Sequence, residues 1–209
     1  HPDPYAEYIL AADASYGRGQ DYSAFHIINL YNGEQVAEFY SNKTSISEFA
    51  RAINDTGKDY NLAHVVVERN GLGIPLIQEL FERLEYENIW MDDKQEFGFQ
   101  MTTQTREKVL SFLEEALRSS RFRINSERTI DELNTFVITD TGKIEADKGY
   151  HDDLVMSLAL AALVSADLST GLPVEIGKGE EKETKQQLPH MIRVSNNSET
   201  HEDTSWLLK

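Results

Sequence analysis

The sequence contains no cysteine, which excludes disulfide bridges, zinc sites built on thiolates and cysteine nucleophiles. It also lacks a hydrophobic run as long as the roughly 18 residues that a membrane-spanning helix needs. The best stretch, from Leu154 to Val164, is shorter and is interrupted by Ser157. No Gly-x-x-x-x-Gly-Lys-Ser/Thr motif is present, so this chain has no nucleotide-binding P-loop of its own. A transmembrane segment is therefore excluded, and we expect no membrane partner.

Basic residues are scarce as well. Twenty Lys and Arg stand against 36 Asp and Glu, and the net charge of −16 argues against extensive contacts with nucleic-acid phosphates. Only residues 101–130 carry a positive balance. This stretch is either a local phosphate-binding face or the solvated side of a helix and its exit loop. Its six cations are Arg106, Lys108, Arg118, Arg121, Arg123 and Arg128.

The 209 residues, 40% of them hydrophobic, are enough for one domain with a sizeable core. We assign residues 1–170 to this domain. Residues 171–209 show no apolar periodicity, so we expect a partly irregular C-terminal tail there. The chain begins with His1 and not with Met, which indicates a piece of a longer protein.

The first half of the sequence predicts a small sheet. A short apolar run at 9–12 ends in Asp13 and reads as a buried strand. Runs at 24–30 and 35–40 flank Asn32-Gly33, a strong hairpin signal, so these three strands should form a meander. A Ser/Thr-rich start predicts a helix over 48–54, which would cross back to a parallel strand at 64–68.

The second half alternates helices with short strands, and the whole pattern predicts an α/β fold with a mixed sheet and flanking helices. A last helix, apolar on nearly all sides, starts at Asp152-Asp153 and should be buried. Before it we expect a helix ending near 84, a strand at 89–91, a helix over 103–117, an edge strand at 122–124, helical spacing from Ile130 to Val137, and a turn at 141–143.

Carboxylates stand at the ends of three of these elements. Asp13 follows the first strand and Glu68 ends the fourth, and two parallel neighbours would place them at one sheet edge. The last helix could bring Asp152 and Asp153 to that edge. Clustered carboxylates repel one another, and a bound hard divalent cation usually neutralises that repulsion. Two such ions suit in-line displacement at phosphorus.

Each of these residues also has a simpler explanation. An Asp after a strand is often a turn residue, and a Glu after a strand can simply face solvent. Paired aspartates at a helix start commonly act as an N-cap. His151 adjoins them and could bind a metal, orient a carboxylate or contact phosphate.

Three segments carry a family resemblance. Leu10 to Tyr22 (LAADASYGRGQDY), Val66 to Gly73 (VVERNGLG) and Gly149 to Leu158 (GYHDDLVMSL) resemble the nuclease domain of the large terminase subunit of tailed bacteriophages. The likeness spans roughly residues 5–165. It implies a ribonuclease H-like fold of the resolvase and integrase type. The family's catalytic acids match Asp13, Glu68 and one or both of Asp152 and Asp153, of which we favour Asp153.

The resemblance implies a metal-dependent endonuclease that cuts concatemeric viral double-stranded DNA when packaging starts and ends. It implies Mg²⁺ or Mn²⁺, with two ions, and makes residues Arg106 to Arg128 a candidate DNA-guiding surface. The expected partners are double-stranded DNA, the portal protein, the small terminase subunit and an upstream ATPase domain of the same polypeptide. The expected place is the procapsid portal in the host cytoplasm. A junction resolvase-like nuclease and a non-catalytic docking module remain alternatives.

Overall fold

The computed structural model describes residues 2–17, 21–138, 144–147 and 149–170. Its centre is a four-stranded sheet in the order β3-β2-β1-β4. The strands are β1 (Tyr8–Asp13), β2 (Ser23–Asn29), β3 (Gln35–Ser41) and β4 (His64–Val67). The pairs β1–β2 and β2–β3 are antiparallel, whereas β1 and β4 are parallel. The predicted meander with a parallel fourth strand is confirmed.

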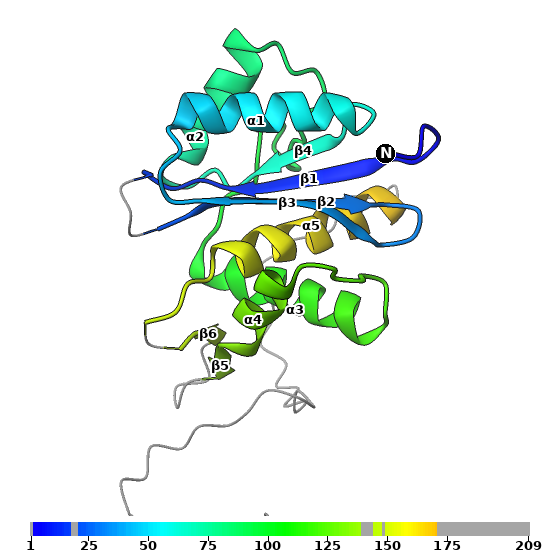
Figure 1. The fold of residues 1–209 in the computed structure, drawn as a ribbon, viewed down its shortest axis with the longest axis vertical. Helices are drawn as coiled ribbons and strands as arrows, with labels where there is room; N and C mark the ends of the chain where they lie inside the picture. The colour runs from blue at the N-terminus through cyan, green and yellow to red at the C-terminus, as the bar shows by residue number, and fades with distance from the viewer. Residues whose placement is uncertain (1, 18–20, 139–143, 148, 171–209) are drawn as a thin grey trace, which may run out of the picture.

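Helices cover both faces of this sheet (Figure 1). One face carries α1 (Ile46–Asp59) and α2 (Gly73–Gln78), which continues into a π-helical turn, η1 (Glu79–Arg83). The other face carries α5 (Asp153–Thr170), which contacts β1 and β2. Beyond α5 lie α3 (Thr103–Arg118) and α4 (Glu127–Asn134). Because α5 lies between the sheet and these two helices, its apolar sequence is buried as predicted.

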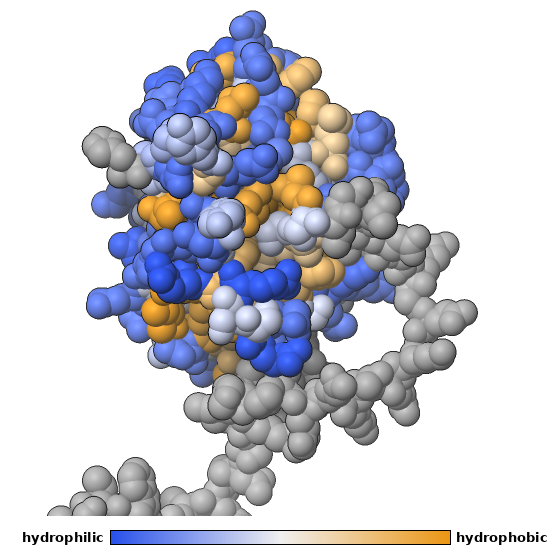
Figure 2. All heavy atoms as spheres, turned by 90° about the vertical axis from the view of Figure 1, so that its right-hand side faces the viewer, coloured by the Kyte–Doolittle hydropathy of each residue, from blue (hydrophilic) through white to orange (hydrophobic). Residues whose placement is uncertain are grey.

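Alternation along β1 divides the core into two clusters. Ile9 and Ala11 face α5 and α3, whereas Leu10 and Ala12 face α1 and α2. Opposite faces of a strand carry alternate side chains, so a strand buried on both sides must be apolar throughout. Hydrophilic residues cover most of the side face in Figure 2, and hydrophobic ones emerge mainly across its middle.

Local signals explain the hairpin and the first crossover helix. Gly33 has a φ of +70°, and a Cβ there would lie 1.5 Å from the carbonyl oxygen of Arg121, so only glycine fits. Ser45 and Glu48 form a capping box at the start of α1. This helix is longer at both ends than the predicted 48–54.

Three predicted elements are wrong in form. Residues 89–91 and 122–124 make only isolated bridges and no continuous strand. The helical spacing predicted to reach Val137 stops at Asn134, where the Thr135 hydroxyl donates to the carbonyl of Glu132. Phe136 then begins β5 (Phe136–Ile138), which pairs with β6 (Ile144–Ala146). This partner strand is supplied from later in the chain, so the spacing alone was misleading.

The predicted turn at 141–143 and the tail at 171–209 lie outside the described residues. Among the helices that the structure describes, none is both long and apolar enough to cross a membrane.

Candidate active site

The parallel pairing of β1 and β4 places two acids side by side. Ala12 is paired with Val67, and the N–H of Glu68 donates to the carbonyl of Ala12 at 3.0 Å. Asp13 and Glu68 are the next residues of the two strands. The prediction that they share the carboxyl edge of the sheet is therefore confirmed.

The first turn of α5 adds two more acids to this edge. Asp153 opens the helix and is only 9% exposed, and its carboxylate accepts a hydrogen bond from the backbone N–H of Tyr22. Asp152 precedes it and forms a partly buried ion pair with Arg106, at 2.6 Å between Nη2 and Oδ2. Both aspartates act electrostatically on Asp13. Four carboxylates from three separate elements thus meet in one place.

Burial and mutual repulsion raise the pKa values of three of these carboxyls. Burial raises the pKa of Asp13 well above its usual value, and the negative charges of Glu68, Asp153 and Asp152 raise it further. Burial raises the pKa of Glu68 to about 7, with Arg106 opposing the shift and Asp152 adding to it. The pKa of Asp153 is raised to about 6, again chiefly by burial and then by Asp152. The edge therefore carries more acid than Arg106, which pairs with Asp152, can balance.

A hard divalent cation fits this donor set by chemistry and by charge, because carboxylate oxygens are its preferred ligands. Among the described residues, however, no three His, Asp or Glu side chains stand close enough to surround one ion as they are placed. The carboxylate of Asp152 is turned to Arg106. Binding therefore requires the side chains to converge, and Asp152 would join them while Arg106 competes for its carboxylate.

His151 lies beside this group of acids. Its Nδ1 is 3.8 Å from Oδ2 of Asp153, and its charge, when protonated, opposes the rise in the pKa of Asp153. Its ring meets the edge of Tyr22 at 5.0 Å between centroids. Tyr22 in turn stacks on Tyr40, and the guanidinium of Arg128 lies over the Tyr40 ring. These contacts favour an orienting role for His151 over an unrelated surface position.

The six basic residues do not form one surface. Arg106 and Arg128 lie near the acids, through Asp152 and through the Tyr40 stack. Arg121 adjoins Gly33 in the β2–β3 turn. That turn is at the opposite end of the sheet, since the β1 register runs from Tyr8 opposite Asn29 to Asp13 opposite Ala24.

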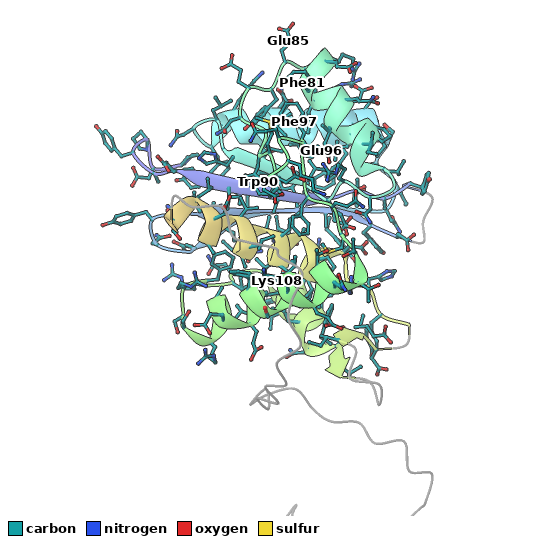
Figure 3. The ribbon with its side chains drawn as sticks, turned by 180° about the vertical axis from the view of Figure 1, so that it is seen from behind. Phe81, Glu85, Trp90, Glu96, Phe97 and Lys108 are labelled. Carbon is teal, nitrogen blue, oxygen red and sulfur yellow. The ribbon has the colours of Figure 1, made fainter. Side chains whose placement is uncertain are left out.

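Ion pairs further reduce the free positive charge of this set. Arg123 pairs with Glu34 and Arg118 with Glu115. Arg128 pairs with Glu38 at 3.3 Å. Lys108 lies on α3, labelled in the view from behind in Figure 3. The predicted basic face is thus divided between two ends of the domain.

One acid near this edge was missed in the sequence. Glu132 of α4 is 8% exposed, and its Oε1 accepts the N–H of Val155 at 2.8 Å. Burial raises its pKa to about 7, and the charge of Asp153 contributes to that rise. No local pattern marks Glu132, because its hydrogen-bond partner, the N–H of Val155, is brought to it by the packing of α4 against α5. The only signal was an acid adjoining the periodic apolar positions Ile130 and Leu133.

Comparison with known proteins gives a consistent result. The family model "Terminase RNaseH-like domain" matches residues 10–164, a range that contains all four acids of the edge. The large terminase subunit of Thermus virus P23-45 is 27% identical over 161 residues, which are 74% of this chain and 31% of that protein. The chain thus spans about a third of the length of this curated relative.

Solved structures agree in fold. The large terminase nuclease of thermophilic phage G20c with bound magnesium is 25% identical, with a TM-score of 0.65 over 77% of this chain and 82% of that one. The same nuclease with bound cobalt is 26% identical, with the same TM-score and coverage. The predicted ribonuclease H-like fold is confirmed. The chain belongs to the family of terminase ribonuclease H-like domains.

Proposed function

We propose that this chain is the nuclease domain of a large terminase subunit and hydrolyses phosphodiester bonds of double-stranded DNA with divalent metal ions. The observation that carries the proposal is the sheet edge at which Asp13, Glu68, Asp152 and Asp153 gather. Burial and neighbouring acids raise the pKa values of Asp13, Glu68 and Asp153 there. A related nuclease domain with bound magnesium supports it.

The proposed roles follow from where each side chain lies. Asp13, Glu68 and Asp153 would hold Mg²⁺ or Mn²⁺, in a pair of ions, and Asp152 would join them or tune them. Bound cations of this kind activate a water molecule and stabilise the leaving oxygen. Arg106 counters the charge of Asp152 and Glu68, and its guanidinium would also attract a substrate phosphate at this edge. His151 orients Asp153 through Nδ1.

The substrate and the partners extend this proposal. The likeness to large terminase subunits supports a role in genome packaging, and we infer that the domain cuts concatemeric viral DNA at initiation and termination. An upstream ATPase domain, the portal protein and the small terminase subunit would deliver that DNA at the procapsid portal. The divided basic residues fit a domain that holds DNA weakly and depends on such partners for engagement.

The test is cleavage of supercoiled plasmid in Mg²⁺, in Mn²⁺ and in EDTA, with calorimetric metal titration on the same protein. Asp13→Asn should abolish metal-dependent cutting, whereas Asp59→Asn, at the exposed end of α1, should leave it unchanged. Full activity of Asp13→Asn would refute the assignment.

A substrate panel separates the remaining alternatives. Strong preference for a branched junction over linear duplex would indicate a resolvase-like nuclease instead. Absence of both metal binding and cutting would favour a docking module. Metal binding without cutting would place the missing requirement in the partner domains.

A further inference from the structure

The first turn of α5 is capped from outside the helix. Asp152 is in the N-cap position, because its carbonyl accepts the N–H of Met156 at 2.8 Å. An aspartate there normally turns its side chain to the backbone N–H groups of the first turn. Here the carboxylate of Asp152 is paired with Arg106, and Oε1 of Glu132 accepts the N–H of Val155 instead. The capping carboxylate comes from α4.

The helix that carries Glu132 is itself anchored to the sheet. The backbone N–H groups of Asn125 and Ser126 both donate to Oε1 of Gln35, at 2.8 and 2.9 Å. Ser126 is the N-cap of α4 and accepts the N–H of Thr129 with its side chain. The start of α4 is thereby tied to β3, and Glu132 follows in the second turn of the same helix.

The same Gln35 also reaches α5 by a second route. Because its Oε1 accepts two backbone donors, its Nε2 must donate, and it does so to Nδ1 of His26 at 2.8 Å. His26 therefore carries its proton on Nε2, which donates to the carbonyl of Leu154 at 3.0 Å. Burial lowers the pKa of His26 to about 4, which agrees with a neutral ring.

Two buried side chains thus hold the backbone of the first turn of α5. Glu132 accepts the N–H of Val155, and His26 donates to the carbonyl of Leu154. These two contacts set the rotation of the turn that presents Asp152 and Asp153. Both contacts trace back to Gln35, so sheet, α4 and α5 share one buried hydrogen-bond network.

We propose that Glu132 is a positioning residue of the nuclease site: by capping α5 from α4 it fixes the turn that carries Asp152 and Asp153, so that neither of these carboxylates is used to cap the helix. This inference rests on the proposed nuclease function. Residues that orient metal ligands in this indirect way typically change metal affinity or activity by 10- to 100-fold when they are replaced.

The test compares Glu132→Ala with Glu132→Gln in the whole chain. Alanine leaves the Val155 N–H without its acceptor, whereas the glutamine oxygen can still accept it. The control is Tyr86→Phe, which removes another buried hydrogen bond, from the Tyr86 hydroxyl to the Ala63 carbonyl, in the core cluster on the other face of the sheet. The measurements are calorimetric Mg²⁺ and Mn²⁺ affinity, the Mg²⁺ dependence of plasmid cleavage, and thermal unfolding in EDTA.

We expect Glu132→Ala to raise the half-saturating Mg²⁺ concentration about 10- to 100-fold. Glu132→Gln should keep most of the wild-type affinity, and Tyr86→Phe should keep all of it while lowering the melting temperature. Wild-type affinity and cleavage in Glu132→Ala would overturn the proposal. An equal loss in Glu132→Gln would also overturn it, since that result makes Glu132 a metal ligand.

The outcomes separate this inference from the proposed function. A loss of affinity in Tyr86→Phe that matches Glu132→Ala would overturn the inference alone, because general loss of stability would then explain both. A wild-type chain that neither binds metal nor cleaves DNA would overturn the proposed function, and the role of Glu132 with it.

Discussion

Removing the charge of Asp13 should stabilise the metal-free domain while it abolishes metal binding. Asp13 is surrounded by Glu68, Asp153 and Asp152, and its burial raises its pKa well above the usual 3.8. In Asp13→Asn the amide keeps nearly the same shape, and its oxygen can still accept the N–H of Ala14 that now reaches the carboxylate. Only the ionisable group is lost.

The size of the effect follows from proton linkage. Whatever the folded-state pKa of Asp13, the destabilisation at pH 7 is at most about 1.4 kcal/mol for each pH unit above its ordinary pKa of 3.8, or about 4 kcal/mol. Relaxation and water access lower this, so we expect a gain of about 1–3 kcal/mol, or about 3–10 °C in melting temperature. At pH 4.5 the same reasoning leaves about 1 kcal/mol.

The assay is urea and thermal unfolding of wild type, Asp13→Asn and the exposed control Asp59→Asn, in EDTA, from pH 4.5 to 7.5. A raised folded-state pKa means that stability is present below the unfolded pKa and is lost as the pH rises through the folded pKa. The wild type should therefore lose stability over this range relative to Asp13→Asn. The reasoning would be refuted if Asp13→Asn were less stable than wild type at pH 7.5, or if the difference in unfolding free energy between the two proteins became smaller as the pH rises.

Three further results are expected. Adding Mg²⁺ should raise the melting temperature of the wild type at pH 7.5 and much less at pH 5. Glu68 and Asp153, with pKa values of about 7 and 6, must release protons to bind the ion. Calorimetry at the two pH values measures the two shifts in melting temperature, and equal shifts would contradict the prediction. Arg128→Gln should weaken binding to duplex DNA and reduce the salt dependence of that binding by about one ion. Arg121→Gln, at the far end of the sheet, should change neither. Fluorescence anisotropy across a salt series measures both, and equal effects of the two variants would show that DNA does not bind at the Tyr40 end of the sheet. Gly33→Ala should lower the free energy of unfolding in urea by at least about 2 kcal/mol, because its Cβ would collide with the Arg121 carbonyl. Gly71→Ala, also at positive φ but in open space, should lower it by only about 1 kcal/mol. Equal losses in the two variants would contradict a cost from the collision.

Local signals were sufficient wherever a structure depends on neighbours in the chain. The Asn32-Gly33 hairpin, the capped start of α1 and the β-branched strand before Glu68 all lie where they were expected. The parallel pairing of β1 with β4 followed from the helix between them, since a crossover of that kind returns the chain in the same direction. That pairing placed Asp13 beside Glu68.

The basic stretch shows why closeness in sequence was misleading. Its six cations lie within residues 106–128, but α3 extends through 16 residues, about 24 Å of helix. Arg106 therefore reaches the acids while Arg118 and Arg121 lie near the opposite end. The carboxylate partners of Arg123 and Arg128 could not be assigned from the sequence, because both come from the β2–β3 hairpin.

The sequence by itself determined the four strands of the central sheet, the buried last helix and the identity of the acids at the strand ends, because these depend on apolar periodicity and on residues adjacent in the chain. The tertiary structure alone decided which partner each acid near the start of α5 contacts. Asp152 is turned to Arg106, and Glu132 replaces it as the cap of α5. Such roles depend on how α3, α4 and α5 pack against one another, and helix packing brings together side chains whose separation in sequence carries no local signal.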